Sequence, residues 1–143
     1  MLLWLSASLH LLALGFGLAA IAIRSRLLGQ IPDPALLTRL FRADNWWHLA
    51  LALWLLSGGA LLALAPPAHP SPWLYLKLAL FLLILLPEWH CCKVLRQWRE
   101  RQARSRLPAP GDAGLLTLIS QWQLLASVLC LFAATAVRLF QIS

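Results

Sequence analysis

Residues 73–90 read WLYLKLALFLLILLPEWH, an apolar run with a lysine near its start and a glutamate near its end. A helix needs roughly 20 apolar residues to cross the hydrocarbon of a bilayer, and this run with its flanks supplies them. The stretch therefore predicts a membrane-spanning helix. Ionisable side chains within such a helix are costly and usually have a function, so Lys77 and Glu88 are the first candidates for functional residues.

The composition of the whole chain is that of an integral membrane protein. Of its 143 residues, 61% are hydrophobic and 12% are charged, and the mean hydropathy of +0.74 lies outside the range of soluble globular domains. Apolar runs predict spans at about 2–23, 45–65, 73–95 and 113–137. We expect residues 1–143 to form a single all-α domain, a four-transmembrane-helix bundle in a lipid bilayer.

The start of the second span has its own signals. Residues 35–42 are amphipathic enough to predict a short interfacial helix before span two. Asp44 or Asn45 would then cap the first turn of that span, because their short side chains accept hydrogen bonds from free backbone N–H groups.

The basic residues predict the orientation of the bundle. Arginine and lysine gather in the first and third connections, whereas the second connection has neither. Basic connections stay in the cytoplasm, so both termini are predicted to lie outside (N-out/C-out). This placement accounts for the net charge of +7. The chain carries no nucleic-acid-binding motif, and we expect no nucleic-acid partner.

The polar side chains within the predicted spans fall into two layers. The outer layer lies near the termini and comprises His10, Tyr75 and Lys77, with His69 in the second connection. The inner layer lies at the start of span two and the end of span three. Its members are Asp44, Asn45, His48, Glu88, His90, Cys91 and Cys92.

His10 is the candidate ligand of a cofactor. It shares one stripe of the first span with the small residues Ser6, Ala13, Gly17 and Ala20. An imidazole on such a stripe offers a nitrogen donor and space for a macrocycle, which predicts His10 as an axial ligand to the iron of a b-type haem. The alternative is a histidine that hydrogen bonds across helices.

A second axial ligand would come from the same outer layer, where His69, Lys77 and Tyr75 are the options. Lys77 has two further interpretations. Its side chain either extends to the outer interface, or neutralises a carboxylate or propionate of a bound molecule.

The inner layer leaves similar alternatives open. Glu88 is either satisfied by Lys93 or Arg96 at the inner surface, or takes part in a proton relay or a quinone contact. His48 and His90, if paired, would form a separate inner haem or metal site.

Several motifs resemble those of a bacterial family of four-span membrane proteins known as domain of unknown function 2214. They are LFRADNWW at residues 40–47, WLYLKLALF at 73–81, LILLPE at 83–88 and Trp98-Arg99. The resemblance covers nearly the whole chain, including His10. It implies a four-span fold and a multi-pass protein of the bacterial cytoplasmic (inner) membrane, with no established activity.

A first-span histidine and a lysine at the start of the third span also resemble, more distantly, the four-helix haem-associated proteins of the HemJ and CopD type. That resemblance implies haem binding with porphyrin oxidation, or a copper-related role.

These features lead to one main hypothesis and two alternatives. The main hypothesis is a membrane protein that binds haem b and acts in electron transfer or porphyrin-linked redox chemistry, with a quinone or a porphyrin as partner. The second is a non-catalytic small subunit or assembly factor of a larger membrane complex. The third is a channel or carrier formed by a homo-oligomer.

Overall fold

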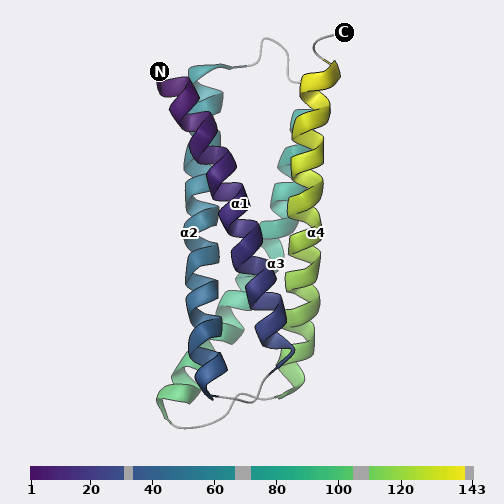
Figure 1. Ribbon diagram of the computed structural model, residues 1–143. Helices are drawn as coiled ribbons and strands as arrows, with labels where there is room; N and C mark the ends of the chain where they lie inside the picture. The colour runs from purple at the N-terminus through teal and green to yellow at the C-terminus, as the bar shows by residue number, and fades with distance from the viewer. Residues whose placement is uncertain (31–33, 67–71, 105–109, 141–143) are drawn as a thin grey trace.

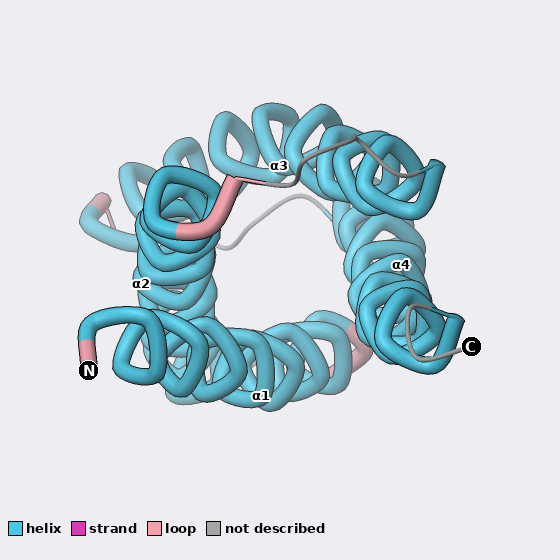
Figure 2. Tube along the Cα trace, turned by 90° about the horizontal axis from the view of Figure 1, so that it is seen from above, coloured by secondary structure: helices cyan, strands magenta, loops and turns pink. Residues whose placement is uncertain are grey.

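A computed structural model confirms the four-helix architecture, and it describes residues 1–30, 34–66, 72–104 and 110–140 (Figure 1). The helices are α1 (Leu2–Leu28), α2 (Pro34–Leu64), α3 (Pro72–Ala103) and α4 (Pro110–Phe140). Seen along the bundle, they form a ring in the order α1, α2, α3, α4 (Figure 2). Helix α1 begins and α4 ends at the same end of the bundle.

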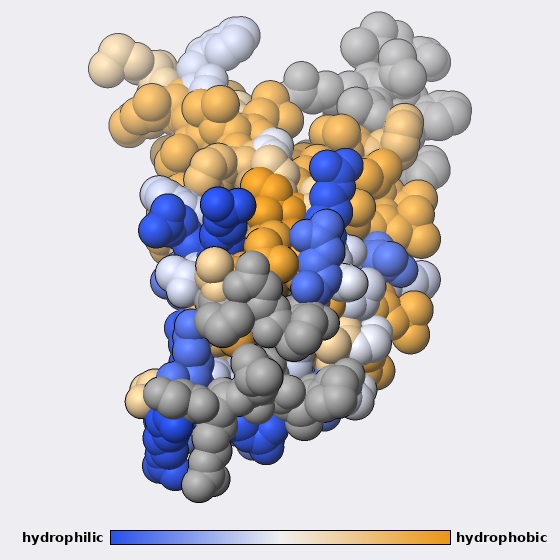
Figure 3. Space-filling model, turned by 60° about the horizontal axis from the view of Figure 1, so that its bottom comes forward, coloured by the Kyte–Doolittle hydropathy of each residue, from blue (hydrophilic) through white to orange (hydrophobic). Residues whose placement is uncertain are grey.

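Within the described residues, each of the four helices is long enough to cross a membrane and contains an 18-residue window that is apolar enough to do so. The protein is therefore a multi-pass membrane protein surrounded by lipid. Hydrophilic side chains gather at the end where α1 and α3 finish, and apolar side chains cover the flanks toward the other end (Figure 3). This distribution agrees with the basic residues of the first and third connections lying at one end of the bundle. Which side of the membrane that end faces stays a prediction, as does the N-out/C-out orientation.

The predicted interfacial helix before span two is wrong, because residues 35–42 form the first turns of the continuous helix α2. No glycine or proline lies between residues 35 and 57 to end the helix. The apolar face of this segment is also buried. Leu37 and Leu40 pack in a cluster with Trp98 of α3 and Leu116 of α4, so the segment belongs to the bundle instead of lying flat on a membrane surface.

Helices α1 and α3 both continue past their predicted ends. Helix α1 ends at Leu28 instead of near Ile23, and α3 ends at Ala103 instead of near Leu95. The added turn of α1 contains Arg24, and the added turns of α3 contain Trp98 and Arg99. Each extension therefore carries residues into the bundle that the hydropathy pattern assigned to connections.

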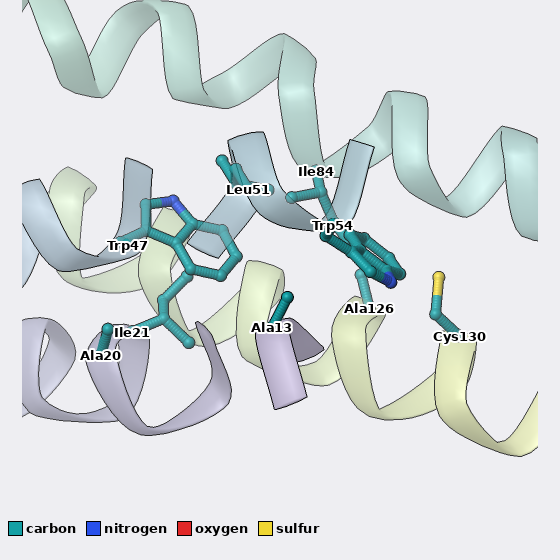
Figure 4. Packing of buried hydrophobic residues seen from close by; sticks show 9 residues of the cluster. All are labelled: Ala13, Ala20, Ile21, Trp47, Leu51, Trp54, Ile84, Ala126 and Cys130. Atoms are coloured by element: carbon teal, nitrogen blue, oxygen red, sulfur yellow. The ribbon is translucent and has the colours of Figure 1, made fainter. Parts of the chain in front are cut away.

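The middle of the bundle is a cluster in which small residues of α1 face large residues of α2. Ala13 and Ala20 lie beside Trp47, Leu51 and Trp54 (Figure 4). Helix α3 contributes Ile84 to this cluster, and α4 contributes Ala126 and Cys130. The stripe of small residues on α1 therefore lets α2 pack closely against it. In lipid, such close van der Waals packing holds helices together, because the hydrophobic effect does not act between them.

Gly17 is the closest point of this packing, and a substitution there tests it. A Cβ atom at residue 17 would lie 3.2 Å from Cζ3 of Trp47 and 3.3 Å from Cβ of Ala50, whereas a Cβ at Gly15 would meet nothing within 4 Å. We expect Gly17→Leu to lower the free energy of unfolding by about 1–3 kcal/mol through overpacking, and Gly15→Leu to leave it nearly unchanged. Thermal unfolding in detergent measures both, and equal effects would contradict the assigned packing.

Candidate functional site

The inner layer is organised around Arg24, whose side chain is fully buried. Its guanidinium binds the Glu88 carboxylate with two parallel hydrogen bonds, Nη1 to Oε1 at 2.9 Å and Nη2 to Oε2 at 3.1 Å. Nη1 also donates to Oδ1 of Asp44 at 3.1 Å. An arginine and a carboxylate bind most strongly in this geometry of two parallel hydrogen bonds. Because Arg24 lies on α1, Asp44 on α2 and Glu88 on α3, these bonds join the three helices at one point.

Helix α4 completes the arrangement with two uncharged side chains. Ser120 and Gln123 are both fully buried. Ser120 Oγ accepts from Nε of Arg24 at 3.2 Å, and Gln123 Oε1 accepts from Nη2. Gln123 Nε2 in turn donates to Oε2 of Glu88 at 2.6 Å. Buried charges are tolerated when their hydrogen-bonding capacity is used in this way. We call the group of five residues the ionic core; it comprises Arg24, Asp44, Glu88, Ser120 and Gln123.

The pairing of Glu88 with Lys93 or Arg96 is wrong, because both lie on exposed parts of α3 and Glu88 turns inward to Arg24. Asp44 is likewise not a helix cap, since it lies in the interior of α2. Sequence reasoning missed Arg24, which it used only as a topology signal. A signal was present, because Arg24 follows Ala20 at the i+4 spacing and so continues the stripe of His10.

Arg99 and His48 lie at the edge of the ionic core. Arg99 Nη2 donates to Oδ2 of Asp44 at 2.9 Å and to Oδ1 of Asn45 at 2.8 Å. The positive charges of Arg24 and Arg99 thereby balance the negative charges of Asp44 and Glu88. His48 is half-buried, and its Nε2 lies 3.3 Å from Oε1 of Glu88. The sequence placed His48 level with Glu88, and the structure brings the two side chains into contact.

His90 does not join this group. It is exposed on α3, two residues beyond Glu88 and therefore on roughly the opposite side of the helix. His48 instead contacts Cys92, with Nε2 3.1 Å from Sγ. The predicted pair of His48 and His90 is therefore not formed.

The outer layer brings His10 and Lys77 together, with Lys77 Nζ 3.2 Å from Nε2 of His10. The other ring nitrogen, Nδ1, lies 3.0 Å from Oγ of Ser57, and that hydroxyl donates its hydrogen to the carbonyl of Leu53 at 2.6 Å. Because a hydroxyl has one hydrogen, Oγ must accept from Nδ1–H. This network assigns the lone pair to Nε2, where it accepts from the Lys77 ammonium.

A pocket of about 290 Å³ lies beside this pair, between α2 and α3. Two aromatic rings form part of its wall, those of Trp54 and Phe81, with centroids 5.2 Å apart in an edge-to-face arrangement. Gly58 permits the close approach of His10, since a Cβ there would lie 3.2 Å from Cε1 of the imidazole. The pocket is lined by His10, Trp54, Leu55, Gly58, Gly59, Leu61, Leu62, Leu74, Lys77, Leu78 and Phe81.

The other predicted outer ligands are not placed at His10. Tyr75 is exposed, and it does not line the pocket. His69 lies outside the described residues. Of the candidates for a second axial ligand, Lys77 is the one that the described structure brings to His10.

The fold and the two polar layers can be compared with known proteins. No curated protein and no solved structure matches the chain. One family model, described as "Predicted membrane protein (DUF2214)", matches residues 3–138. This match includes all the residues of the ionic core and of the outer pocket, and the chain therefore belongs to the DUF2214 family of membrane proteins.

Proposed function

We propose that the chain binds, in its outer pocket, a planar lipid-soluble molecule that carries a carbonyl oxygen, and that a membrane quinone taking part in redox chemistry is this ligand. The observation that carries the proposal is the hydrogen-bonded pair of His10 and Lys77 at the wall of an apolar pocket. An apolar cavity with a few convergent polar groups is the usual form of a small-molecule site.

Lys77 supplies the polar contact for such a ligand. Its ammonium has three N–H groups, and within the described part of the chain its hydrogen-bond partner is His10. Two N–H groups are therefore available to a carbonyl oxygen in the pocket. A charged donor to a carbonyl gives a stronger hydrogen bond than a neutral one.

The apolar walls suit a flat ring and an apolar tail. Trp54 and Phe81 offer faces and edges against which a planar ring packs. Leu55, Leu62 and Leu78 line the same pocket and are exposed on the flank of the bundle that lipid covers. A lipid-soluble ligand would therefore enter from the bilayer between α2 and α3.

Haem b fits this arrangement less well. An iron ligated by His10 would need the Nε2 lone pair that now accepts from Lys77. The pocket of about 290 Å³ also lies at the small end of the roughly 300–1,000 Å³ range of ligand sites. A single-ring head group requires neither a free Nε2 nor a larger volume. Haem remains the second candidate because the imidazole faces the pocket, and His10 would then be the iron ligand with Lys77 at a propionate.

The test is the content of the purified protein. We expect quinone to be extracted from wild-type protein, and Lys77→Met to reduce its binding tenfold or more, since a hydrogen bond to a charged group contributes roughly 1.5–3 kcal/mol. Lys93→Met is the matched control, because Lys93 is an exposed lysine of the same helix. Chromatography of the organic extract measures the quinone, and the visible spectrum measures haem.

The outcomes separate the hypotheses. A Soret band that disappears in His10→Ala would establish haem in place of quinone. Equal quinone content in the Lys77 and Lys93 variants would contradict the proposed site. Co-purification with a larger complex, with function unchanged in both His10 and Lys77 variants, would favour the subunit or assembly-factor hypothesis.

The proposed location is the bacterial inner membrane, with both termini outside.

A further inference from the structure

We propose that His48, Glu88 and Cys92 bind a zinc ion at the edge of the ionic core. One ligand atom from each of these side chains lies within 4.8 Å of the other two. Glu88 and Cys92 have the i, i+4 spacing on α3 and so share one face of it, and His48 reaches them from α2. The site shares no residue with the outer pocket and does not rest on the function proposed for that pocket.

The orientation of His48 is that of a metal ligand. Its Nδ1 lies 2.8 Å from the backbone carbonyl oxygen of Asp44, and a carbonyl only accepts, so Nδ1 carries a hydrogen. In the neutral ring the Nε2 lone pair then points toward Oε1 of Glu88 at 3.3 Å and toward Sγ of Cys92 at 3.1 Å. A hydrogen bond from the far ring nitrogen to a backbone carbonyl is the usual support of a metal-binding histidine.

Three arrangements satisfy the Nε2 lone pair at these distances. They are a hydrogen bond from the Cys92 S–H, a proton that makes His48 an imidazolium next to Glu88, and a zinc ion. Zinc is favoured because an imidazole, a carboxylate and a sulfur converge on one point. Zinc accepts imidazole, carboxylate and thiolate together, and its bond lengths of about 2.0–2.3 Å place donors roughly 3.3–3.7 Å apart in a tetrahedron. The two separations from Nε2, 3.1 Å to Sγ and 3.3 Å to Oε1, are close to that spacing, and the Glu88 oxygen and Sγ lie within 4.8 Å of each other.

The surrounding charges allow a metal ion and predict its fourth ligand. Arg24 and Arg99 contribute two positive charges, zinc adds two, and Asp44, Glu88 and the Cys92 thiolate subtract three, which leaves a net charge of +1. An anion or hydroxide at the fourth position would neutralise it. The position is reachable, because the His48 side chain is 39% exposed. Three protein ligands with an open position are the pattern of reactive zinc sites.

Metal binding to the full chain, purified in detergent without a polyhistidine tag, tests the site. After chelator treatment, we expect one Zn²⁺ per chain to bind. We expect Co²⁺ to give a thiolate-to-metal charge-transfer band. Cys92→Ser should remove that band, and Cys92→Ser and His48→Gln should each weaken Zn²⁺ binding tenfold or more, since even outer partners of a metal ligand contribute about 10–100-fold.

Two controls match these variants. His90→Gln removes an exposed histidine of α3, and Cys130→Ala removes a buried cysteine of α4, and both are expected to bind Zn²⁺ like the wild type. Circular dichroism and size-exclusion chromatography establish that each variant is folded. A Co²⁺ spectrum without a thiolate band, or unchanged Zn²⁺ binding in folded Cys92→Ser, would overturn the proposal and leave a proton, in place of a metal ion, between His48 and its neighbours.

Discussion

Replacing Arg24 with methionine is expected to lower the free energy of unfolding by about 3–5 kcal/mol, the cost of leaving a buried charge without its partner. Glu88 and Asp44 would lose the guanidinium hydrogen bonds that they receive in the bundle interior. Asp44 would keep Arg99, so the loss falls mainly on Glu88. Unfolding of the detergent-solubilised protein, followed by circular dichroism, measures the change.

The matched control is Arg26→Gln. Arg26 lies two residues further along α1 and is exposed, so its removal changes the net charge equally but is expected to shift stability by less than about 0.5 kcal/mol. A second variant, Arg24→Met combined with Glu88→Met, removes both charges and should recover much of the lost stability. If the double variant is no more stable than Arg24→Met alone, the unpaired Glu88 carboxylate is not the cause.

Trp98→Ala is expected to have a comparable effect, also about 3–5 kcal/mol, because it removes a large buried side chain and leaves a cavity. Trp98 is 0% exposed. It lies in the cluster that joins Leu37 and Leu40 of α2 to Leu116 of α4. Its loss would therefore loosen the end of the bundle next to the ionic core.

Trp89→Ala is the control for this variant. Trp89 belongs to the same helix but is 71% exposed, so its replacement deletes the same atoms without opening a cavity. Thermal unfolding of the two variants in the same detergent compares them. Similar losses of stability would show that the extension of α3 does not pack as the structure has it.

The fold was predictable because its signals are local. A run of about 20 apolar residues is enough to predict a membrane span, and four such runs predicted the four helices that the structure contains. The ends of the helices were less predictable. Residues 35–42 were predicted as a separate interfacial helix and the end of α3 as a connection. Both are instead parts of α2 and α3 in the bundle, where Leu37, Leu40 and Trp98 pack in one buried cluster.

The polar residues were likewise predictable only in part, because the sequence indicated their depth but not their partners. Depth alone predicted His10 and Lys77 in the same outer layer, with Lys77 as one of three options for a second ligand, and the structure places the two side chains 3.2 Å apart. Depth also placed His48 level with Glu88. Depth gave no information on which way a side chain turns, so the exposed His90 was grouped with them. Arg24 was left out because hydropathy ended the first span near Ile23 and assigned Arg24 to the connection.

The sequence by itself therefore determined the number of spans, the family and the depth of the polar residues, because hydropathy and helical rise are properties of each segment alone. Only the tertiary structure decided which charges pair. Arg24, Asp44, Glu88 and Gln123 come from four different helices, and their partners depend on how each helix is rotated in the bundle. That rotation is set by close packing between helices, such as Gly17 against Trp47, and no single segment encodes it.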